Sequence, residues 1–431
     1  MSFTEAKALP LASRIGRGPR MWLHELGPGL ITGAADDDPS GIVTYSQAGA
    51  AFGYTLGWSV VLTLPFMVAV QEISARLGRV TGCGLAAALK RHAPLPVLAA
   101  LVGMLVLANV INLGADIGAM AAVSQLLAGG SQVPYAIGFA VLCASTEIWL
   151  AYKRYVKLLK WLTVSLLAYV ALLFVVDVQW GEALRGAFVP RLSLDRDTLT
   201  TVLAVLGTTI SPYLFFWQAA EEAEDELNEP DPRPLREHPA DARTQMQRIG
   251  VDTWSGMTFS NLVALAMVIG SAATLHAHGV TDIATAADAA SALRPIAGPF
   301  AQIVFSLGIF GTGLLAIPTL AGSAAYAVGE ALNWTVGLSR RAIEARAFYA
   351  FIAGATLVGT AIVFSPIDPI KALFWSAVIN GVVAGPLIAA MTVLGSLRSV
   401  MGALVLPVWL RALGWASALL MAAGTVAMVV V

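Results

Sequence analysis

Three consecutive aspartates stand in a stretch that otherwise reads as membrane-embedded. In GAADDDPSGIVTY, residues 33–45, Asp36, Asp37 and Asp38 precede a Pro-Ser-Gly tripeptide. Carboxylates inside a membrane are costly, and they generally face an interior or an aqueous path where they handle ions. Carboxylates, carbonyls, hydroxyls and water are hard oxygen ligands that suit Mg²⁺, Ca²⁺ or Mn²⁺. The pattern therefore predicts a binding site for a divalent cation.

Two helix breaks accompany these residues. Pro39 interrupts the first apolar run, and Pro212 interrupts a later one in GTTISPYLFFW, residues 207–217. Proline removes a backbone donor and clashes with the preceding turn, so each run is predicted to divide into two half-helices. Half-helix ends and freed carbonyls coordinate ions where they line a protein cavity. Asp38, beside the proline, is the first candidate ligand. Asp36 and Asp37 have the alternative role of capping or interhelical bonding, because three successive side chains cannot point the same way.

Soft ligands are missing from both breaks. Neither contains Met, Cys or His, which disfavours a thiolate or imidazole site and leaves no evident histidine proton relay. Cys83 and Cys143 match no metal or redox spacing. The chain also lacks a His-Glu-x-x-His sequence, so an intramembrane enzyme is not expected. No bound cofactor is expected other than the transported ion.

A protein with many membrane spans must position these residues. The 431 residues are 57% hydrophobic and 12% charged, with a mean hydropathy of +0.75, whereas soluble domains are about 25% charged. Runs of about 20 apolar residues predict helices that cross the bilayer. The eleven predicted spans are 28–52, 56–78, 96–126, 133–152, 157–177, 198–222, 251–275, 297–328, 344–364, 370–392 and 412–431.

The basic residues predict the orientation. If residues 1–27 are cytoplasmic and the spans alternate, most of the 26 Lys and Arg residues fall on the cytoplasmic side. The acidic segment 221–248 falls there too, and we expect a solvated loop or, alternatively, a vestibule that gathers cations. The chain is thus predicted to lie in the cell membrane. The net charge of −1 indicates no nucleic-acid partner, and a monomer in the lipid bilayer is expected.

The two breaks fall in the first and sixth predicted spans. This spacing is typical of two five-helix repeats that each open with a broken helix, and because five is odd the second repeat is inverted. We therefore predict a first repeat over 28–177, an outer loop over 178–197 and an inverted repeat over 198–392. The remaining residues, 393–431, are predicted to hold an eleventh helix.

At these two breaks the sequence resembles the natural resistance-associated macrophage protein (NRAMP) family of divalent-metal transporters. GPGLITGAADDDPSG is similar to the family's first span, where an Asp-Pro-Gly-Asn sequence reads Asp38-Pro-Ser-Gly41 here. The family's Met-Pro-His sequence in the sixth span reads Ser211-Pro-Tyr213. The likeness covers nearly the whole chain in span number, break positions and loops, and it implies an all-helical LeuT-type fold with broken first and sixth helices.

The resemblance implies a metal site at named residues. Asp38 is the metal-binding aspartate, and the Thr208 carbonyl takes the place of the family's backbone ligand. The family's asparagine is Gly41 and its methionine is Ser211, so two side-chain ligands have changed. The histidine used in proton transfer becomes Tyr213. The acidic pair of the third span falls on Asn112 and Ala115, with Asp116 displaced by one residue.

These losses are similar to the NRAMP-related magnesium transporters, a branch whose wider site is thought to hold a partly hydrated ion. Mg²⁺ dehydrates reluctantly and keeps several waters, for which Gly41 and Ser211 leave room. We therefore expect a carrier with alternating access, for Mg²⁺ first and Mn²⁺ second, without proton coupling. The alternatives are a proton-coupled Mn²⁺/Fe²⁺ transporter of the NRAMP type and a LeuT-type carrier of a small organic solute.

Other polar residues inside the spans have less certain roles. Asp116 is either a second acid near the metal or an interhelical hydrogen-bonding group. Asn380 is a candidate water-mediated partner of the metal, and Asn261 is expected to bond between helices. Gln218 and Glu222 share a face with Ser211 and are expected to mark a polar helix end that leaves the membrane or, alternatively, to line the inward path from the break to the acidic segment. The glycines of GIFGTGLLA, residues 308–316, predict close helix packing.

Overall fold

The computed structural model describes residues 27–150, 152–191, 193, 195–228, 233–237, 239–283, 285–365 and 369–430. These residues form helices joined by short connections, and no strand occurs among them. The first predicted span is broken where Pro39 predicts it: α2 runs over Pro28–Asp36 and α3 over Pro39–Phe52. The sixth is broken in the same way, into α11 over Arg196–Thr209 and α12 over Pro212–Leu227.

Helices occupy the other predicted spans as well. They are α4 (Gly57–Thr81), α6 (Leu95–Ala128), α7 (Gln132–Trp149), α8 (Tyr152–Leu162) with η3 (Thr163–Leu166) and α9 (Leu167–Leu172), α13 (Ala242–Thr274), α14 (Ala286–Ala331), α15 (Arg346–Val363), α16 (Pro369–Ser396) and α18 (Val408–Val430). Shorter helices that were not predicted connect them. These are η2 (Gly53–Leu56), α5 (Leu85–Lys90), α10 (Trp180–Phe188), η4 (Pro239–Asp241), η5 (His276–His278) and α17 (Arg398–Met401).

Eight helical stretches of the described residues are long and apolar enough to cross a membrane. The first of them, Pro39–Thr81, contains α3 and α4 together, and the seven others correspond to single predicted spans or to both halves of the sixth. The predicted spans 133–152 and 157–177 are not among the eight. The second of these is the segment that the structure divides among α8, η3 and α9.

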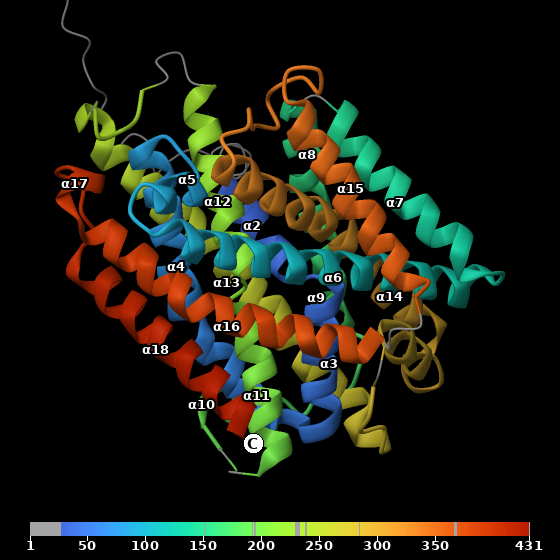
Figure 1. Ribbon diagram of the computed structural model, residues 1–431. Helices are drawn as coiled ribbons and strands as arrows, with labels where there is room; N and C mark the ends of the chain where they lie inside the picture. Colours follow the sequence, from blue (N-terminus) through green and yellow to red (C-terminus); the bar gives the residue numbers. More distant parts are fainter. Residues whose placement is uncertain are drawn as a thin grey trace, which may run out of the picture.

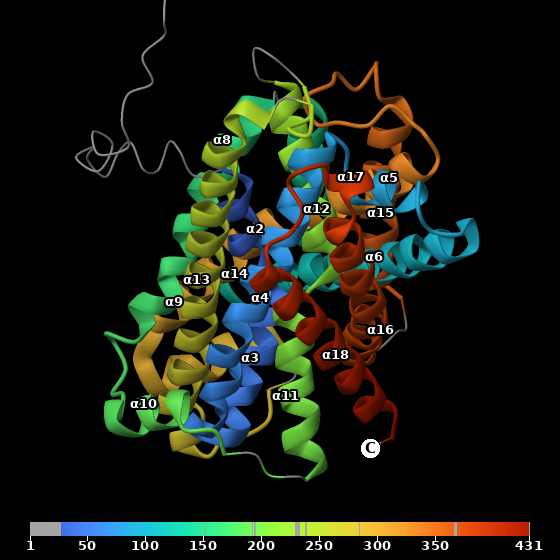
Figure 2. The ribbon, with the colours of Figure 1, turned by 90° about the vertical axis from the view of Figure 1, so that its left-hand side faces the viewer.

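The broken helices lie inside the bundle. α13 packs against α2, α3 and α4, while α14 packs against α6 and α12. Both views show α16 and α18 side by side, with α18 at the lower left edge in Figure 1 and both helices toward the right in Figure 2. The connecting helices α5 and α17 and the basic helix α8 lie toward one end, and α10 lies at the other. This grouping agrees with the separation of basic residues that the positive-inside rule predicts.

Small residues let the helices approach closely. A β-carbon on Gly33 of α2 would overlap the Gly256 backbone of α13, so these two helices meet backbone to backbone. Gly308 of α14 instead makes room for a side chain, because the Tyr169 ring of α9 packs directly over it. The predicted packing role of the glycine-rich stretch 308–316 is confirmed, because side chains from neighbouring helices fill the space beside its glycines.

The acidic segment after the sixth span differs from the prediction. A solvated loop over 221–248 is wrong for its first part, since α12 continues to Leu227 and α13 begins at Ala242. Glu222 is buried and pairs with Arg248. Glu224 is buried too, and it accepts hydrogen bonds from the Tyr326 hydroxyl and from the Leu338 and Ser339 amides. These partners compensate the burial of the carboxylates, which explains why a run of acids lies inside the protein.

Candidate functional site

The break between α2 and α3 is fixed by local chemistry. Asp38 is the N-cap of α3, and its Oδ1 accepts hydrogen bonds from the Gly41 amide at 2.6 Å and the Ser40 hydroxyl at 2.7 Å. Pro39 occupies the first helical position, where its missing N–H costs nothing. The aspartate-proline pair thus starts the second half-helix and holds one carboxylate at its end. Asp38 is 4% exposed.

The break between α11 and α12 releases backbone carbonyls. Ser211 precedes Pro212, and its hydroxyl donates to the Thr208 carbonyl at 2.9 Å and to the Gly207 carbonyl at 3.3 Å. These carbonyls belong to the last turn of α11, where no further helical amide is available to them. Ser211 therefore acts on the predicted metal-binding carbonyl through a hydrogen bond.

The structure brings the two breaks together. A β-carbon on Gly41 would lie 2.9 Å from Cγ2 of Thr208 and 3.3 Å from Oδ1 of Asp38. The Tyr213 hydroxyl of α12 donates to the Ala35 carbonyl of α2 at 2.7 Å, which joins the breaks a second time. Three of the predicted ligand residues therefore lie together: Asp38 and Gly41, which are buried, and Thr208, which is half-buried. Ser211 adjoins this group through its hydrogen bond to the Thr208 carbonyl.

The other predicted site residues lie around this group. Asp116 of α6 is fully buried and interacts electrostatically with Asp38. Neither of its carboxylate oxygens has a hydrogen-bond partner among the described residues. Asn380 is buried on α16, a helix that contacts both α11 and α12, and its Oδ1 likewise has no partner in the described part of the chain. Asp116 therefore lies in the electrostatic neighbourhood of Asp38, whereas no described contact joins Asn380 to either break.

Asp37 has different surroundings. Its side chain is fully buried, and neither carboxylate oxygen accepts a hydrogen bond from a described residue. It interacts electrostatically with Asp36 and Asp38 and lies near Ser260 of α13. No described contact joins it to Thr208 or Ser211. Across the described ranges, no three His, Cys, Asp or Glu side chains are grouped as a metal-binding cluster.

Two asparagines bond between helices. Asn261 of α13 donates to the Val60 carbonyl of α4 at 2.7 Å and to the Thr63 hydroxyl at 3.2 Å, which confirms its predicted role. Asn112 of α6, at one of the positions where the resemblance implies an acid, accepts a hydrogen bond from Ser376 of α16 at 2.7 Å. Neither residue needs a metal to satisfy these contacts.

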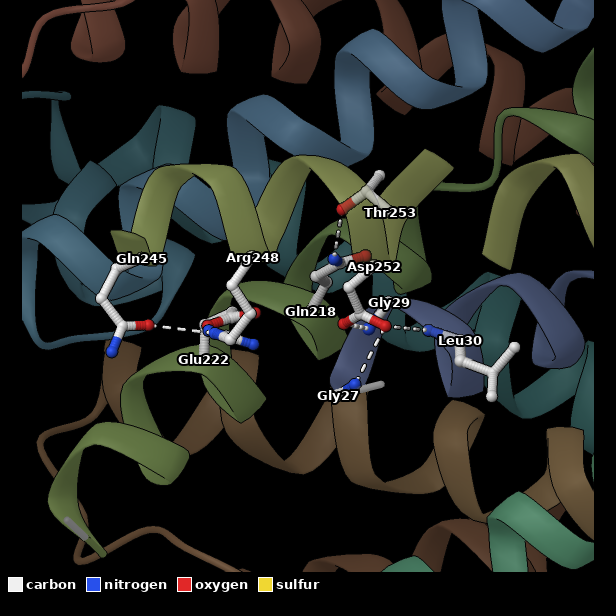
Figure 3. A network of polar contacts seen from close by, with 9 residues as sticks. All are labelled: Gly27, Gly29, Leu30, Gln218, Glu222, Gln245, Arg248, Asp252 and Thr253. Atoms are coloured by element: carbon white, nitrogen blue, oxygen red, sulfur yellow. Dashed lines mark hydrogen bonds and ion pairs between the residues drawn. The ribbon is translucent and has the colours of Figure 1, made fainter. Parts of the chain in front are cut away.

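A polar network ties two of the half-helices, α2 and α12, to α13 (Figure 3). Asp252 of α13 accepts hydrogen bonds at the start of α2 from the amides of Gly27 at 2.9 Å, Gly29 at 2.8 Å and Leu30 at 3.2 Å. A carboxylate is well placed there, because the first amides of a helix lack internal partners and carry the positive end of its dipole. Asp252 thus fixes the position of α2.

The same network holds α12. Gln218 donates to the Thr253 hydroxyl at 3.2 Å, and Glu222 pairs with Arg248, which also contacts Gln245 (Figure 3). Gln218 and Glu222 are fully buried, so both side chains make their polar contacts inside the protein. Asp252 is not among the predicted site residues, although an acid inside the predicted span 251–275 carries the same signal as Asp116.

Comparison with known protein families and sequences gives a consistent result. A family model described as natural resistance-associated macrophage protein-like (Nramp) matches residues 29–431. A divalent metal cation transporter MntH of Klebsiella pneumoniae subsp. pneumoniae is 27% identical over 425 residues, which cover 96% of this chain and 95% of the relative. The MntH of Yersinia pestis is 32% identical over 316 residues, covering 70% of this chain and 71% of the relative.

Solved structures show the same fold. A manganese transporter of Eremococcus coleocola superposes with a TM-score of 0.78 at 16% identity, covering 95% of this chain and 87% of that one. Mhp1, a nucleobase-cation-symport-1 family transporter, gives a TM-score of 0.58 at 14% identity, with 94% and 91% covered. The predicted LeuT-type arrangement of two inverted five-helix repeats with broken first and sixth helices is confirmed.

Proposed function

This chain belongs to the Nramp family, and from that premise we propose that it carries divalent metal cations across the membrane by alternating access. The observation that carries the proposal is the contact between the two breaks at Asp38, Gly41 and Thr208. It places a carboxylate beside a helix end whose carbonyls have few partners. A hard dication is the ligand that this combination suits.

The groups at the break have separable roles. Oδ1 of Asp38 accepts both hydrogen bonds described for that carboxylate, so Oδ2 is the oxygen that faces the ion. The Thr208 carbonyl accepts one hydrogen bond and keeps a second lone pair for the metal. Asp116 adds negative charge nearby. Water fills the remaining coordination positions, because the described residues offer no third strong side-chain ligand.

Two kinds of observation bear on the identity of the ion, and they favour different metals. The divalent metal cation transporters named MntH and the manganese transporter of E. coleocola favour the alternative given above, an Mn²⁺/Fe²⁺ transporter of the NRAMP type, with Mn²⁺ as its ion. The residues at the break favour Mg²⁺, because Gly41 and Ser211 provide no soft ligand and leave space for a hydrated ion. We propose Mn²⁺ as the first substrate on the strength of the relatives and Mg²⁺ as the second candidate.

Uptake into proteoliposomes tests the proposal. We expect saturable uptake of a divalent cation by the wild-type protein and loss of that uptake in Asp38→Asn. Asparagine is a good N-cap, so this variant keeps the start of α3 while removing the ligand charge. Asp177→Asn, an exposed aspartate away from the breaks, is the matched control and should transport normally. Normal uptake by Asp38→Asn would refute the site.

The same vesicles discriminate the remaining alternatives. Competition among Mn²⁺, Mg²⁺ and Ca²⁺ gives the order of preference, and an internal pH dye reports proton movement. A transporter of the proton-coupled type acidifies or alkalinises the lumen as metal enters, whereas the uncoupled reading predicts no change. Inhibition by organic solutes in place of metals would instead support the organic-solute carrier.

A further inference from the structure

The short helix α10, Trp180–Phe188, turns its large apolar side chains outward. Trp180, Leu184 and Phe188 are 50%, 56% and 68% exposed. They are four residues apart and therefore form one apolar stripe along the helix. The buried positions of α10 are Ala183 and Ala187. With nine residues, the helix is too short to cross a bilayer.

The face of α10 that docks on η2 and α4 is made of small residues. A β-carbon on Gly186 would overlap the Tyr54 carbonyl of η2, so the two backbones touch. Ala183 joins Val178 and Ile269 in a small apolar cluster that is separate from the main core. Small side chains allow this close approach but bury little apolar area. The docking face therefore supplies little of the hydrophobic stabilisation that so short a helix needs.

The flank of α10 opposite the apolar stripe is polar. With 3.6 residues per turn, Glu182 lies nearly opposite Leu184 on the helix. Glu182 and Arg185, which form this polar flank, are both exposed. They line a hollow of about 360 Å³ between α10 and η5, where His276 lines it too. Charged groups thus occupy one side of α10 and large apolar groups the other.

The apolar stripe continues an exposed apolar surface of the neighbouring chain. A surface helix in water turns its large apolar residues toward the core, which α10 does not do. Phe174 and Val175, in the connection from α9 to α10, are 84% and 47% exposed. Figure 2 shows α10 at the lower left edge of the molecule, below α9. This continuity with the side of the bundle indicates that lipid surrounds the stripe.

We propose that α10 lies in the membrane interface, with its apolar stripe among the acyl chains of the phospholipids and its polar flank in water. A helix with Trp, Leu and Phe on one flank and charged groups on the other has the pattern of an interfacial helix, and Trp is enriched at this depth. The contact between Gly186 and Tyr54 passes this anchoring to η2, which joins α3 to α4. The lipid thereby fixes the depth of the end of α3, the second half of the broken first span. The inference does not depend on the ion that is carried.

Electron paramagnetic resonance of spin-labelled protein in phospholipid vesicles tests the proposal. Cys83 and Cys143 are replaced by alanine, and a nitroxide is attached to one introduced cysteine at a time. The labelled variants are Trp180→Cys, Leu184→Cys and Phe188→Cys on the stripe, and Glu182→Cys and Arg185→Cys on the polar flank. The measurement compares collisions with O₂, which concentrates in lipid, and with a neutral nickel chelate, which stays in water.

Two further labels calibrate the scale. Leu262→Cys, at an exposed position of α13, gives the value for lipid, and Asp282→Cys, at an exposed position before α14, gives the value for water. We expect the ratio of O₂ to nickel collisions to be severalfold higher on the stripe than on the polar flank. The stripe should approach the Leu262→Cys value and the polar flank the Asp282→Cys value.

A charge in the stripe gives the comparison its cause. Leu184→Glu should move the label of Phe188→Cys toward the water value, whereas Arg185→Glu on the polar flank should leave it unchanged. Size-exclusion chromatography confirms that each variant is folded. Stripe labels that meet the nickel chelate as freely as Asp282→Cys does would overturn the proposal. Stripe labels protected from both reagents would overturn it too, because protein, such as a second copy of this chain, would then cover the stripe.

Discussion

Thr208 lies directly against Gly41 across the two helix breaks, with its methyl carbon 2.9 Å from the position that a β-carbon on Gly41 would occupy. The same β-carbon would stand 3.3 Å from Oδ1 of Asp38. Residues that are far apart in the sequence therefore share one tight contact. An added methyl group has room only if Thr208 or Asp38 moves.

Gly41→Ala is expected to lower the initial rate of metal uptake by about 10-fold to 100-fold, the range that small misplacements of reacting or binding groups produce. The added methyl pushes Thr208 or the Asp38 carboxylate away from the ion. Thr208→Ser in the same chain removes the opposing methyl and keeps the carbonyl, so the double variant should recover most of the rate. Proteoliposome uptake at a fixed ion concentration measures both effects.

The control for that series is Gly103→Ala on α6, where an added β-carbon meets nothing within 4 Å. It should transport as the wild type does. Wild-type rates in Gly41→Ala would show that the contact with Thr208 plays no part in ion binding. Failure of Thr208→Ser to improve Gly41→Ala would place the steric conflict at Asp38 instead.

Ser211→Met is expected to shift ion preference toward softer metals. The serine hydroxyl donates to the carbonyls of Thr208 and Gly207, and methionine would free both carbonyls and add a polarisable sulfur. The ratio of Cd²⁺ to Mg²⁺ uptake should rise severalfold in competition assays. Ser255→Met, at a half-buried serine that bonds within its own helix α13, is the matched control. An unchanged ratio would show that position 211 does not face the ion.

Local patterns predicted the helix breaks well. An Asp or Ser followed by Pro is a short-range signal for the start of a helix, and α3 and α12 begin at Pro39 and Pro212 as expected. Short helices such as α5 and α10 carry too few residues for a clear periodic signal. The acids from Glu221 onward resemble a solvated loop in sequence because five of them occupy the six positions 221–226, and nothing local reveals that four of these are buried.

The candidate site was predictable only in part for the same reason. Asp38, Gly41 and Thr208 lie in the breaks themselves, so their types and positions carried the signal. The carboxylate of Asp252 meets the start of α2 across more than 220 residues, and the Tyr213 hydroxyl reaches Ala35 from another helix. Such pairs depend on how the helices pack, which one sequence does not specify residue by residue.

Asp252→Ala is expected to loosen α2. It removes the carboxylate that accepts from the Gly27, Gly29 and Leu30 amides, and loss of a helix cap costs about 0.5–2 kcal/mol. A cysteine introduced at Ser211, in a chain whose two native cysteines are replaced by alanine, should then react faster with a water-soluble maleimide. Asp241→Ala is the control, because Asp241 makes no side-chain cap at the start of α13. Equal labelling rates in Asp252→Ala and wild type would contradict a role for Asp252 in holding α2.

Tyr213→Phe is expected to destabilise the break itself. The Tyr213 hydroxyl donates to the Ala35 carbonyl at 2.7 Å, and both groups are buried. Phenylalanine keeps the ring and leaves that carbonyl unpaired, a loss of about 1–3 kcal/mol for a buried acceptor. Thermal unfolding of the purified protein should show a lower Tm for Tyr213→Phe and an unchanged Tm for Tyr135→Phe, whose hydroxyl lies half-buried near a loop. Because this hydrogen bond joins the two broken helices beside the metal site, metal uptake should fall as well. A Tm equal to wild type would mean that water replaces the hydroxyl at Ala35 and that this hydrogen bond does not stabilise the packing of α12 against α2.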